Sequence, residues 1–395
     1  MPPKTTVLFL IPSLVANGAE RQLCELVRHL DRGRFTLHVV VFYGPSPGAQ
    51  AGPWFDLAGL QDLTLHCLHK RRGALGYLAA LPRLLALMLR IQPDIVHGYM
   101  DGNLPILLLG RLLRRRVVWG IRRSSRDLTK LDRLSLRMLQ LEVLLARFVD
   151  LVIFNSEAGR SSYRAMGMQA ERMEVVANGF DVERFRPDPA GGVAQRLAWG
   201  VAADAPLIGI VGRLHPVKDH PTFLRAAARL ALEWPKAMFV CVGEGTPKEL
   251  GHLLALAESQ GLAGRVLFPG ACSGMVPAYN ALSCLVLAST DEGFPNVLGE
   301  AMACGIPCVT TRVGDAASLV GAQGIVVPVG DDLAMAKGVS CLLGETAQAR
   351  AARTESARSR LCARFSVHVL AQSTEKLLLD LVPSRAATCP DPGCS

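Results

Sequence analysis

Short apolar runs alternate with helix-forming stretches along almost the whole chain, and no other feature restricts the possible folds as strongly. One series runs from Val7 to Gly179 and a second from Leu207 to Arg364, separated by residues 180–204, which are irregular and rich in proline and glycine. Alternation at this spacing is typical of parallel sheets covered by helices. We therefore predict an α/β protein with two doubly wound, mostly parallel sheets and a hinge at residues 180–204.

The pattern also predicts where the individual elements lie. In the first series we expect strands at Val7–Ile11, Phe35–Phe42, Pro93–Gly98, Val117–Ile121 and Asp150–Asn155, and helices at Asn17–Leu30, Leu75–Ile91, Leu128–Phe148 and Ser156–Met166. In the second we expect strands at Leu207–Val211, Ala237–Val242, Arg265–Phe268, Cys284–Ala288 and Cys308–Thr311, and helices at Pro221–Glu233, Pro247–Gln260, Glu300–Cys304, Leu333–Leu343 and Ala347–Arg364.

The length of 395 residues suits two domains, and the 50% hydrophobic content is ample for two cores. We place the first domain at residues 1–185 and the second at residues 186–365. The amphipathic segment 366–382 is expected to pack back on the first domain, and residues 383–395 to form a disordered tail.

The segment Asp291–Pro307 carries the clearest chemical signal. Its carboxylates Glu292 and Glu300 stand eight positions apart around a Gly-Phe-Pro-Asn turn, and Glu300 is expected to open a helix. Backbone N–H groups at a helix start attract anions, and carboxylates accept hydrogen bonds from hydroxyl groups. The loop therefore suits a ligand that combines an anion with a polyol, as a nucleotide sugar does. The plainer alternative is a helix start whose acidic residues only complement the helix dipole.

A second motif follows the first strand of the second series. Gly212 at the strand end is followed by Arg213 and Lys218, two cations five positions apart in a short loop. Open α/β sheets bind their ligands at the carboxyl ends of the strands. Two cations at that position can neutralise a diphosphate without a metal ion, and two ordinary surface cations are the alternative interpretation.

Together the two motifs resemble the signature of the family-4 glycosyltransferases, which are retaining enzymes of the GT-B fold. The resemblance rests on Gly212-Arg213-Leu214 with Lys218, and on the Glu292/Glu300 segment with its Glu-Ala-Met-Ala-Cys-Gly-Ile-Pro sequence. It extends over almost the whole chain. The GT-B fold implies two Rossmann-like domains that face a central cleft.

Three further segments are similar to the family pattern. Leu14–Glu20 resembles its Gly-Gly-Ala-Glu loop, with Asn17 in place of the first glycine. Asn178–Asp181 resembles the family's motif at the entrance to the hinge. Val313–Asp315 resembles a loop close to the sugar, where the family usually has a second glycine in place of Asp315.

The resemblance implies a role for each matching residue. Arg213 and Lys218 would hold the donor diphosphate and stabilise it as the leaving group. Glu300 would bond the ribose hydroxyls, and Glu292 would hold the hydroxyls of the transferred sugar. His97, at the end of its strand, would lie on the acceptor side of the cleft near the sugar.

The resemblance also assigns contacts to backbone groups of the donor loop and of the first loop. Gly18 would let the first loop approach the phosphates closely. The sugar and the phosphates would contact the backbone of Phe294, Pro295, Asn296 and Val297.

The implied mechanism is a displacement on one face of the sugar with retention of configuration. The acceptor hydroxyl attacks the anomeric carbon on the face from which the diphosphate departs, and the departing phosphate takes the proton. This reaction would need no metal ion, no cofactor and no dedicated protein base. A double displacement would need a nucleophile beneath the anomeric carbon, and the motifs name none.

The net charge of +9 is concentrated in the first half of the chain. Residues 1–185 hold 25 Lys and Arg against 16 Asp and Glu, and ten basic residues fall between Arg111 and Arg137. A basic region of this kind suits an anionic membrane or a phosphorylated lipid-linked acceptor. A core helix with a cationic rim is the alternative. Nucleic acid is not expected as a partner, because no aromatic residues interleave with the cations.

The cysteines and the hydropathy indicate a cytoplasmic protein, and the family resemblance together with the basic first half implies peripheral association with the inner face of the plasma membrane. Eleven cysteines lack the spacing of a disulfide framework or a metal site, which suggests reduced thiols. The apolar stretch Val7–Ile11 is too short for a signal peptide, and no run of about 20 uncharged apolar residues predicts a membrane span.

We therefore expect a retaining glycosyltransferase that moves a sugar from a nucleotide-diphosphate sugar to a hydroxyl of a glycan or lipid-linked acceptor in cell-surface polysaccharide biosynthesis. A nucleotide-sugar epimerase of the same fold and a non-catalytic nucleotide-sugar-binding protein are the alternatives. A dehydrogenase is not favoured, because the Val242–Gly245 loop lacks the third glycine of a dinucleotide fingerprint.

Overall fold

Two parallel sheets form the framework of the molecule. The computed structural model describes residues 4–14, 18–45, 57, 58, 60, 62–71, 73, 75–122, 133–272 and 274–382. The first sheet has the strand order β3-β2-β1-β4-β5-β6-β7, with β1 (Thr5–Ile11), β2 (Phe35–Val41), β3 (Leu63–Cys67), β4 (Ile95–Tyr99), β5 (Arg116–Ile121), β6 (Leu151–Phe154) and β7 (Met173–Val175). The second has the order β10-β9-β8-β11-β12-β13, with β8 (Leu207–Val211), β9 (Met238–Val242), β10 (Val266–Gly270), β11 (Cys284–Leu287), β12 (Cys308–Thr311) and β13 (Ile325–Val327).

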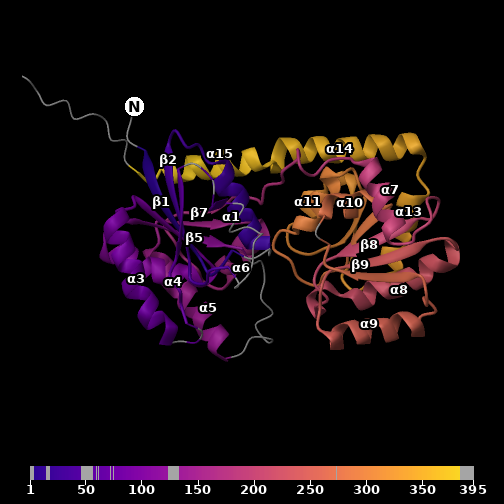
Figure 1. Ribbon diagram of the computed structural model, residues 1–395, viewed down its shortest axis with the longest axis horizontal. Coiled ribbons are helices and arrows are strands. Elements are labelled where there is room, and N and C mark those ends of the chain that lie inside the picture. The colour runs from indigo at the N-terminus through magenta and orange to yellow at the C-terminus, as the bar shows by residue number, and fades with distance from the viewer. Residues whose placement is uncertain are drawn as a thin grey trace, which may run out of the picture.

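Helices cover both faces of each sheet, and the two units lie side by side (Figure 1). The first unit carries α1 (Gly18–His29), α3 (Leu75–Ile91), α4 (Asn103–Leu112), α5 (Arg133–Leu145) and α6 (Glu157–Ala165). The second carries α7 (Pro189–Ala198), α8 (His220–Glu233), α9 (Pro247–Ser259), α10 (Met275–Asn280), α11 (Asn296–Ala303), α12 (Ala316–Val320), α13 (Asp332–Leu343) and α14 (Ala347–Phe365). The prediction of two doubly wound α/β units is confirmed.

Each sheet is buried on both faces, because successive side chains of a strand point to opposite sides. In β1, Val7 and Phe9 belong to one apolar cluster, whereas Leu8 and Leu10 belong to another. The strands of the second sheet divide in the same way, with Leu285 in one cluster and Val286 in the other. Each unit therefore has its own core.

Several elements differ from the prediction. The segment 180–204, expected to be irregular throughout, contains the helix α7, which begins where the Asp188 side chain accepts a hydrogen bond from Gly191 N at 2.9 Å. The helix expected to open at Glu300 begins one turn earlier, at Asn296. Six elements were not expected at all, namely the strands β3, β7 and β13 and the helices α4, α10 and α12. Of the predicted helix 128–148, residues 128–132 lie outside the described residues, as does the predicted tail 383–395.

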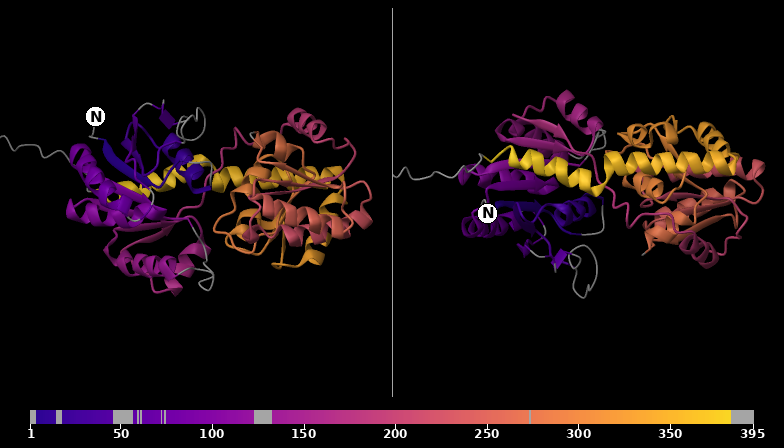
Figure 2. Two further views of the ribbon diagram at one scale, coloured as in Figure 1. Left: turned by 60° about the horizontal axis from the view of Figure 1, so that its bottom comes forward. Right: turned by 90° about the horizontal axis from the view of Figure 1, so that it is seen from above.

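The chain crosses between the two units twice, and the crossings contact each other. Phe180 N donates to Phe365 O at 2.8 Å, and Val367 N donates to Phe180 O at 3.1 Å. Beyond the second crossing, α15 (Val367–Leu379) packs on α1 of the first unit, and Leu370 and Leu378 join its core. Figure 2 shows α14 and α15 as a yellow run of helix across both units.

The sheet order positions the candidate site. In the first sheet the connection after β1 leads to β2 on one side, whereas the connection after β4 leads to β5 on the other side. The connections after β8 and β11 diverge in the same way in the second sheet. Open α/β sheets bind ligands beside such points. Helices α1 and α11 approach each other across the two units at their first residues, because Gly18 and Asn296 lie side by side. The described residues contain no helix that is both long and apolar enough to cross a bilayer.

Candidate functional site

The loops that follow β8 and β11 bring a predicted cation and a predicted carboxylate together. Lys218 Nζ lies 2.5 Å from Glu292 Oε1, and the Ser289 hydroxyl donates to the same oxygen at 2.7 Å. Both charged side chains are largely buried. The pairing follows from the topology, because β8 and β11 are neighbours and both loops leave the same edge of the sheet. Arg213, the other predicted cation, lies on the same loop as Lys218 and is exposed.

The donor loop predicted at residues 294–297 is the start of α11. Pro295 takes the N-cap position and supplies no side-chain acceptor, so the first N–H groups of the helix receive no cap from it. Helix α1 starts at Gly18, where a Cβ atom would lie 3.2 Å from Asn296 Nδ2. Two helix N-termini from different units thus approach each other. Their partial positive charges favour an anion between them.

Glu300 is held by one residue from each unit. The Tyr279 hydroxyl donates to its Oε2 at 2.7 Å, and Arg21 Nη1 of α1 lies 3.1 Å from its Oε1. The Glu300 side chain is almost fully buried, and burial together with this carboxylate raises the pKa of Tyr279 well above its ordinary value. Tyr279 is therefore a stable neutral donor. Its strong bond fixes the carboxylate that the sequence predicts for ribose.

The Phe294 side chain anchors the donor loop in the apolar core. Phe294 is buried against Phe180 and Phe365, with ring centroids 6.2 and 5.6 Å away. Because this packing occupies the side chain of Phe294, only the backbone of this residue is left for the predicted contact with a ligand. The Asn296 side chain accepts a hydrogen bond from Asn178 Nδ2 at 2.8 Å, which ties the loop to the first crossing. Val297 is half-buried.

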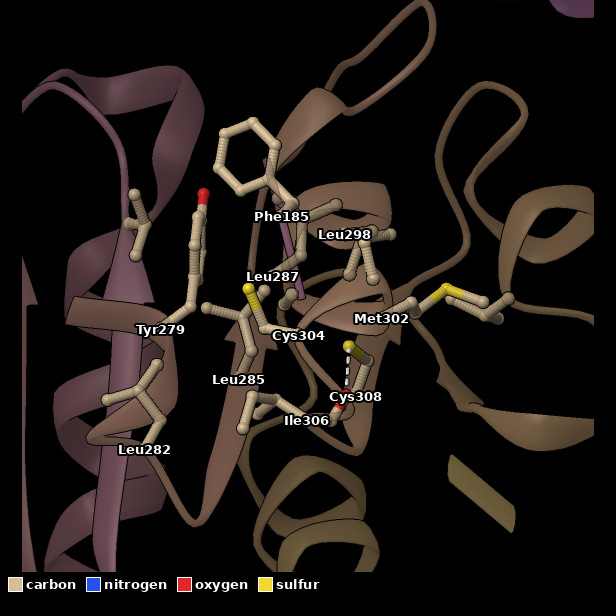
Figure 3. Packing of buried hydrophobic residues seen from close by; sticks show 14 of the residues in the cluster. Phe185, Tyr279, Leu282, Leu285, Leu287, Leu298, Met302, Cys304, Ile306 and Cys308 are labelled. Carbon is tan, nitrogen blue, oxygen red and sulfur yellow. Dashed lines mark hydrogen bonds between the residues drawn. The ribbon is translucent and has the colours of Figure 1, made fainter. Parts of the chain in front are cut away.

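The core behind α11 is dense and apolar (Figure 3). Leu298 and Met302 on the buried face of the helix pack in one cluster with Leu285 and Leu287 of β11. The Cys308 thiol donates to Ile306 O at 3.3 Å. Such packing restrains the helix, and therefore also restrains the orientation of the N–H groups at its start.

His97 is not where the sequence predicted it. It lies in the middle of β4 rather than at its end, and its side chain is completely buried. Its ring stacks on Tyr99 at 4.5 Å, and burial with the nearby Arg122 charge holds the pKa of His97 well below its ordinary value. The residue at the end of the strand is Tyr99, whose hydroxyl accepts a hydrogen bond from Arg122 Nη2 at 3.0 Å. The hydropathy of β4 could not distinguish a buried histidine from one at the strand end.

Asp315 forms a contact between the units that the sequence did not predict. Its carboxylate accepts hydrogen bonds from Glu157 N at 2.8 Å and Ala158 N at 3.0 Å, at the start of α6. The preceding Gly314 has a φ of +46°, and a Cβ atom there would lie 2.1 Å from Glu292 O. Only glycine fits this position, and its conformation directs the Asp315 side chain toward the first unit.

The assembled site offers anion-binding groups around fixed carboxylates. The cations Arg21 and Lys218 and two helix starts lie around Glu292 and Glu300, and Arg213 is exposed on the loop that carries Lys218. This arrangement can hold a diphosphate and the hydroxyls of sugars at the same time. Within the described part of the chain, no group of three or more His, Cys, Asp or Glu side chains is placed to hold a metal ion.

Two family models match successive parts of the chain. Residues 16–184 match the model described as Glycosyltransferase Family 4, and residues 205–345 match the model described as Glycosyl transferases group 1. Together the two models cover most of the chain.

Curated relatives match over shorter stretches. The chain is 34% identical to a putative glycosyltransferase, EpsF, of Bacillus subtilis over 45% of this chain and 46% of that protein. It is 30% identical to D-inositol 3-phosphate glycosyltransferase of Rhodococcus opacus over 66% of this chain and 61% of that protein. The matches thus span about half the length of these curated relatives.

Solved structures match over nearly the full length. Anabaena Alr3699/HepE in complex with UDP and glucose superposes with a TM-score of 0.81 at 24% identity, covering 95% of this chain and all of that chain. WaaG, a glycosyltransferase involved in lipopolysaccharide biosynthesis, gives a TM-score of 0.71 at 15% identity, covering 94% of this chain and 99% of that chain. At these identities the likeness concerns the fold.

Proposed function

The chain belongs to the group 1, family-4 glycosyltransferases and has the GT-B fold, and from this premise we propose that it is a retaining glycosyltransferase. It transfers a sugar from a nucleotide-diphosphate sugar to a hydroxyl of a glycan or lipid-linked acceptor. The observation that carries the proposal is the convergence of the Lys218–Glu292 pair with two helix starts at one point. A uridine diphosphate sugar is the first donor to test, because Alr3699/HepE was crystallised with UDP-glucose.

Each group at the site has a part in this reaction. Arg213 and Lys218 neutralise the diphosphate, and their charge stabilises it as the bond to the anomeric carbon breaks. Glu292 orients Lys218 and accepts hydrogen bonds from the sugar hydroxyls, while Glu300 accepts them from the ribose. The backbone N–H groups at the start of α11 and the close approach at Gly18 complete the phosphate site. The His97 side chain is completely buried within β4, and its catalytic role stays a prediction.

The bond changes balance without a further co-reactant. The acceptor oxygen forms a bond to the anomeric carbon on the face from which the diphosphate oxygen leaves. The departing phosphate takes the acceptor proton, so neither a protein base nor a metal ion is required by the scheme. Contact between the two units excludes water and so limits hydrolysis of the donor.

The proposed setting is cell-surface polysaccharide biosynthesis at a cytoplasmic membrane face. This setting is supported by WaaG, which is a glycosyltransferase involved in lipopolysaccharide biosynthesis, and EpsF is a putative glycosyltransferase. Exposed arginines of the first unit, including Arg133, Arg137 and Arg147, support peripheral contact with anionic lipid.

A thermal-shift screen without added metal tests the donor site. Nucleotide diphosphates and their sugars are added to the wild type, to Lys218→Ala and to the control Lys236→Ala, whose lysine is exposed and pairs with Asp204 at 2.6 Å. A ligand at a hundred times its Kd stabilises the native state by about 2.7 kcal/mol, which raises Tm by roughly 5 °C or more.

We expect one diphosphate series to stabilise the wild type and Lys236→Ala but not Lys218→Ala. Incubation of that donor with a membrane extract then yields a glycosylated product that keeps the anomeric configuration. Donor binding without any transfer would favour a binding protein, and an altered sugar formed without acceptor would favour an epimerase.

A further inference from the structure

The first unit contains a large apolar cavity beside the donor site. Its volume is about 750 Å³, within the range of small-molecule sites, and it lies between α3, α4, α5 and the carboxyl ends of β4 and β5. Most of its lining is aliphatic, and includes Leu81, Leu104, Leu108, Leu134, Met138 and Leu139. A hydrocarbon chain along this aliphatic part would be sheltered from water. The rest of the lining is polar and consists mainly of Tyr77, Asp101, Asn103, Arg122, Ser135, Glu142 and Tyr163.

One end of the cavity is polar and reaches the donor loop. Ala19 lines it, and the adjacent Gly18 contacts Asn296 at the start of α11. Arg122 also lines this end. It donates a hydrogen bond to the Tyr99 hydroxyl, and its guanidinium carbon lies 4.9 Å from the centroid of the Tyr99 ring. The cavity therefore leads from a cation toward the place where the donor phosphates are proposed to bind.

Several polar atoms at this end are buried without a partner among the described residues. Arg122 Nε and Nη1 have no acceptor, and the Asn103 Oδ1 atom has no donor. A buried guanidinium with unused N–H groups is costly unless an anion completes it. Planar N–H pairs on arginine match phosphate oxygens well. Arg122 is thus suited to bind a phosphate, whereas Asn103 Oδ1 can accept a hydrogen bond only from a hydroxyl or N–H group of a ligand.

The other end of the cavity opens on an unusually apolar surface. The cavity-lining residues Leu108, Leu134 and Met138 are 60%, 70% and 46% exposed, respectively. The same faces of α4 and α5 continue with Leu112, Leu141 and Leu144, which are exposed as well. Monomeric proteins seldom present a continuous apolar patch without using it.

Cations border this apolar patch. Arg133 and Arg137 of α5 and Arg147 just beyond it are exposed. An apolar face flanked by basic side chains is the pattern of proteins that rest on an anionic bilayer. The charge and the hydrocarbon-like surface therefore favour the same partner.

We infer that the cavity is the subsite for the apolar chain of a lipid-linked phosphate acceptor. The phosphate binds Arg122, the chain lies in the cavity along α4 and α5, and the acceptor enters from a bilayer on which these helices rest. The inference depends on the proposed glycosyltransferase function and names the acceptor class for the same enzyme. It separates this chain from transferases whose acceptors are free, water-soluble sugars.

Alkyl phosphates of increasing length test the subsite. Butyl, hexyl and octyl phosphate, inorganic phosphate and octanol are titrated as monomers into the full-length protein by calorimetry. Each added pair of buried methylenes should strengthen binding by roughly tenfold. Inorganic phosphate should bind far more weakly than octyl phosphate, since it lacks the chain.

Variants locate the site. Leu108→Glu and Met138→Glu place a charge on the cavity wall and should each weaken octyl phosphate binding about tenfold or more. Leu232→Glu is the matched control, because Leu232 is 86% exposed on α8 of the other unit and should leave binding unchanged. Arg122→Gln should weaken octyl phosphate binding but leave octanol binding as it is.

Donor binding is measured on the same samples, and it also shows that each variant is folded. Normal donor shifts with no dependence on alkyl chain length would overturn this inference and leave the proposed function intact. Loss of donor binding in the wild type would instead count against the proposed function.

Two other occupants of the patch give distinct results. A second copy of the chain would appear as a concentration-dependent dimer that Leu134→Glu abolishes. Coverage by residues 383–395 would appear as binding that arises only after their deletion. Either result would overturn the assignment to a lipid chain.

Discussion

Both glutamates proposed to hold sugar hydroxyls already form hydrogen bonds and ion pairs with protein side chains. Glu292 bonds Lys218 and Ser289, and Glu300 bonds Tyr279 and Arg21. A carboxylate has about four acceptor positions, so hydroxyl groups can be added to these bonds without replacing them. The bonds hold the oxygens in place before the ligand arrives, which lowers the entropy cost of binding.

The Tyr279–Glu300 hydrogen bond is a first test at this scale. Tyr279→Phe keeps the buried ring and its packing on Phe185 but removes the hydroxyl that donates to Glu300. Bonds to charged groups contribute more than neutral ones, so we expect a loss of about 1.5 to 3 kcal/mol in the free energy of unfolding, measured with urea. Donor affinity should fall as well. An unchanged free energy of unfolding would show that the bond is not important in solution.

His220 predicts a pH dependence of stability. Burial and the charge of Lys218 lower its pKa from 6.5 to about 4, and its side chain is 1% exposed. Between pH 6.5 and 4, His220 is therefore protonated in the unfolded chain but mostly neutral in the folded chain. Stability is fully present above pH 6.5 and is lost as the pH falls toward 4, by about 2 to 3 kcal/mol at pH 4.5.

His220→Gln should remove this part of the pH dependence. Between pH 7.5 and 4.5 the free energy of unfolding of the wild type should fall by about 2 to 3 kcal/mol more than that of the variant. Parallel curves for the two proteins would contradict a buried, neutral histidine.

The residues that could be predicted from sequence are those placed by one sheet. Lys218 and Glu292 follow neighbouring strands, so strand order alone brings them together. Arg21 and Asp315 were missed because their partners, Glu300 and the start of α6, belong to the other unit. Local patterns carry no information about how two domains meet.

At the scale of elements, the starts of helices determine much of the site. Helices α1 and α11 present their N-termini to each other, and the N-terminus of α6 receives the Asp315 carboxylate from the second unit. Ser156 also caps α6, because its hydroxyl accepts from Gly159 N at 3.0 Å. The carboxylate of Asp315 thus adds a link between domains to a helix that is already capped.

Removal of that carboxylate should separate the units. Asp315→Ala leaves the Ser156 cap but frees Glu157 N and Ala158 N, so we expect a loss of about 1 kcal/mol and a more open arrangement. Small-angle scattering or an interdomain fluorescence distance reports the opening.

Asp331→Ala is a matched control. Asp331 caps α13 by accepting from Ala334 N at 2.8 Å, entirely within the second unit. Its removal should cost similar stability without any change in the distance between units. Equal opening in both variants would show that Asp315 does not link the domains.

Elements were predictable where hydropathy and helix signals agreed. The fold class followed from alternating strands and helices, because burial on both faces makes parallel strands continuously apolar. Helix α7 was missed although Asp188 and Pro189 form a usual N-cap and first position, since the glycines after them suggested a hinge. Helix α11 was placed too late because the carboxylate Glu300 was taken for its start, whereas that position is a full turn inside.

At the scale of the whole molecule, two consecutive helices serve different domains. Leu361 of α14 belongs to the core of the second unit, and Leu378 of α15 belongs to the core of the first. Both are fully buried. Removal of a buried leucine costs about 2 to 5 kcal/mol wherever it lies, so the two sites can be compared directly.

We therefore expect Leu378→Ala and Leu361→Ala to weaken opposite domains. Hydrogen exchange should accelerate in β1 and β2 for the first variant, and in β11 and β12 for the second. Faster exchange in both domains with either variant would mean that the two units unfold as one.

The double crossing has a mechanical consequence. Residues 5 and 382 both lie on the first unit, so the second unit is an insertion between β7 and α15 rather than the last part of a linear series. A molecule gripped at those two residues and stretched would transmit the load through the first unit alone. The second unit would carry no load and would stay folded until α15 or β1 detached from the first unit.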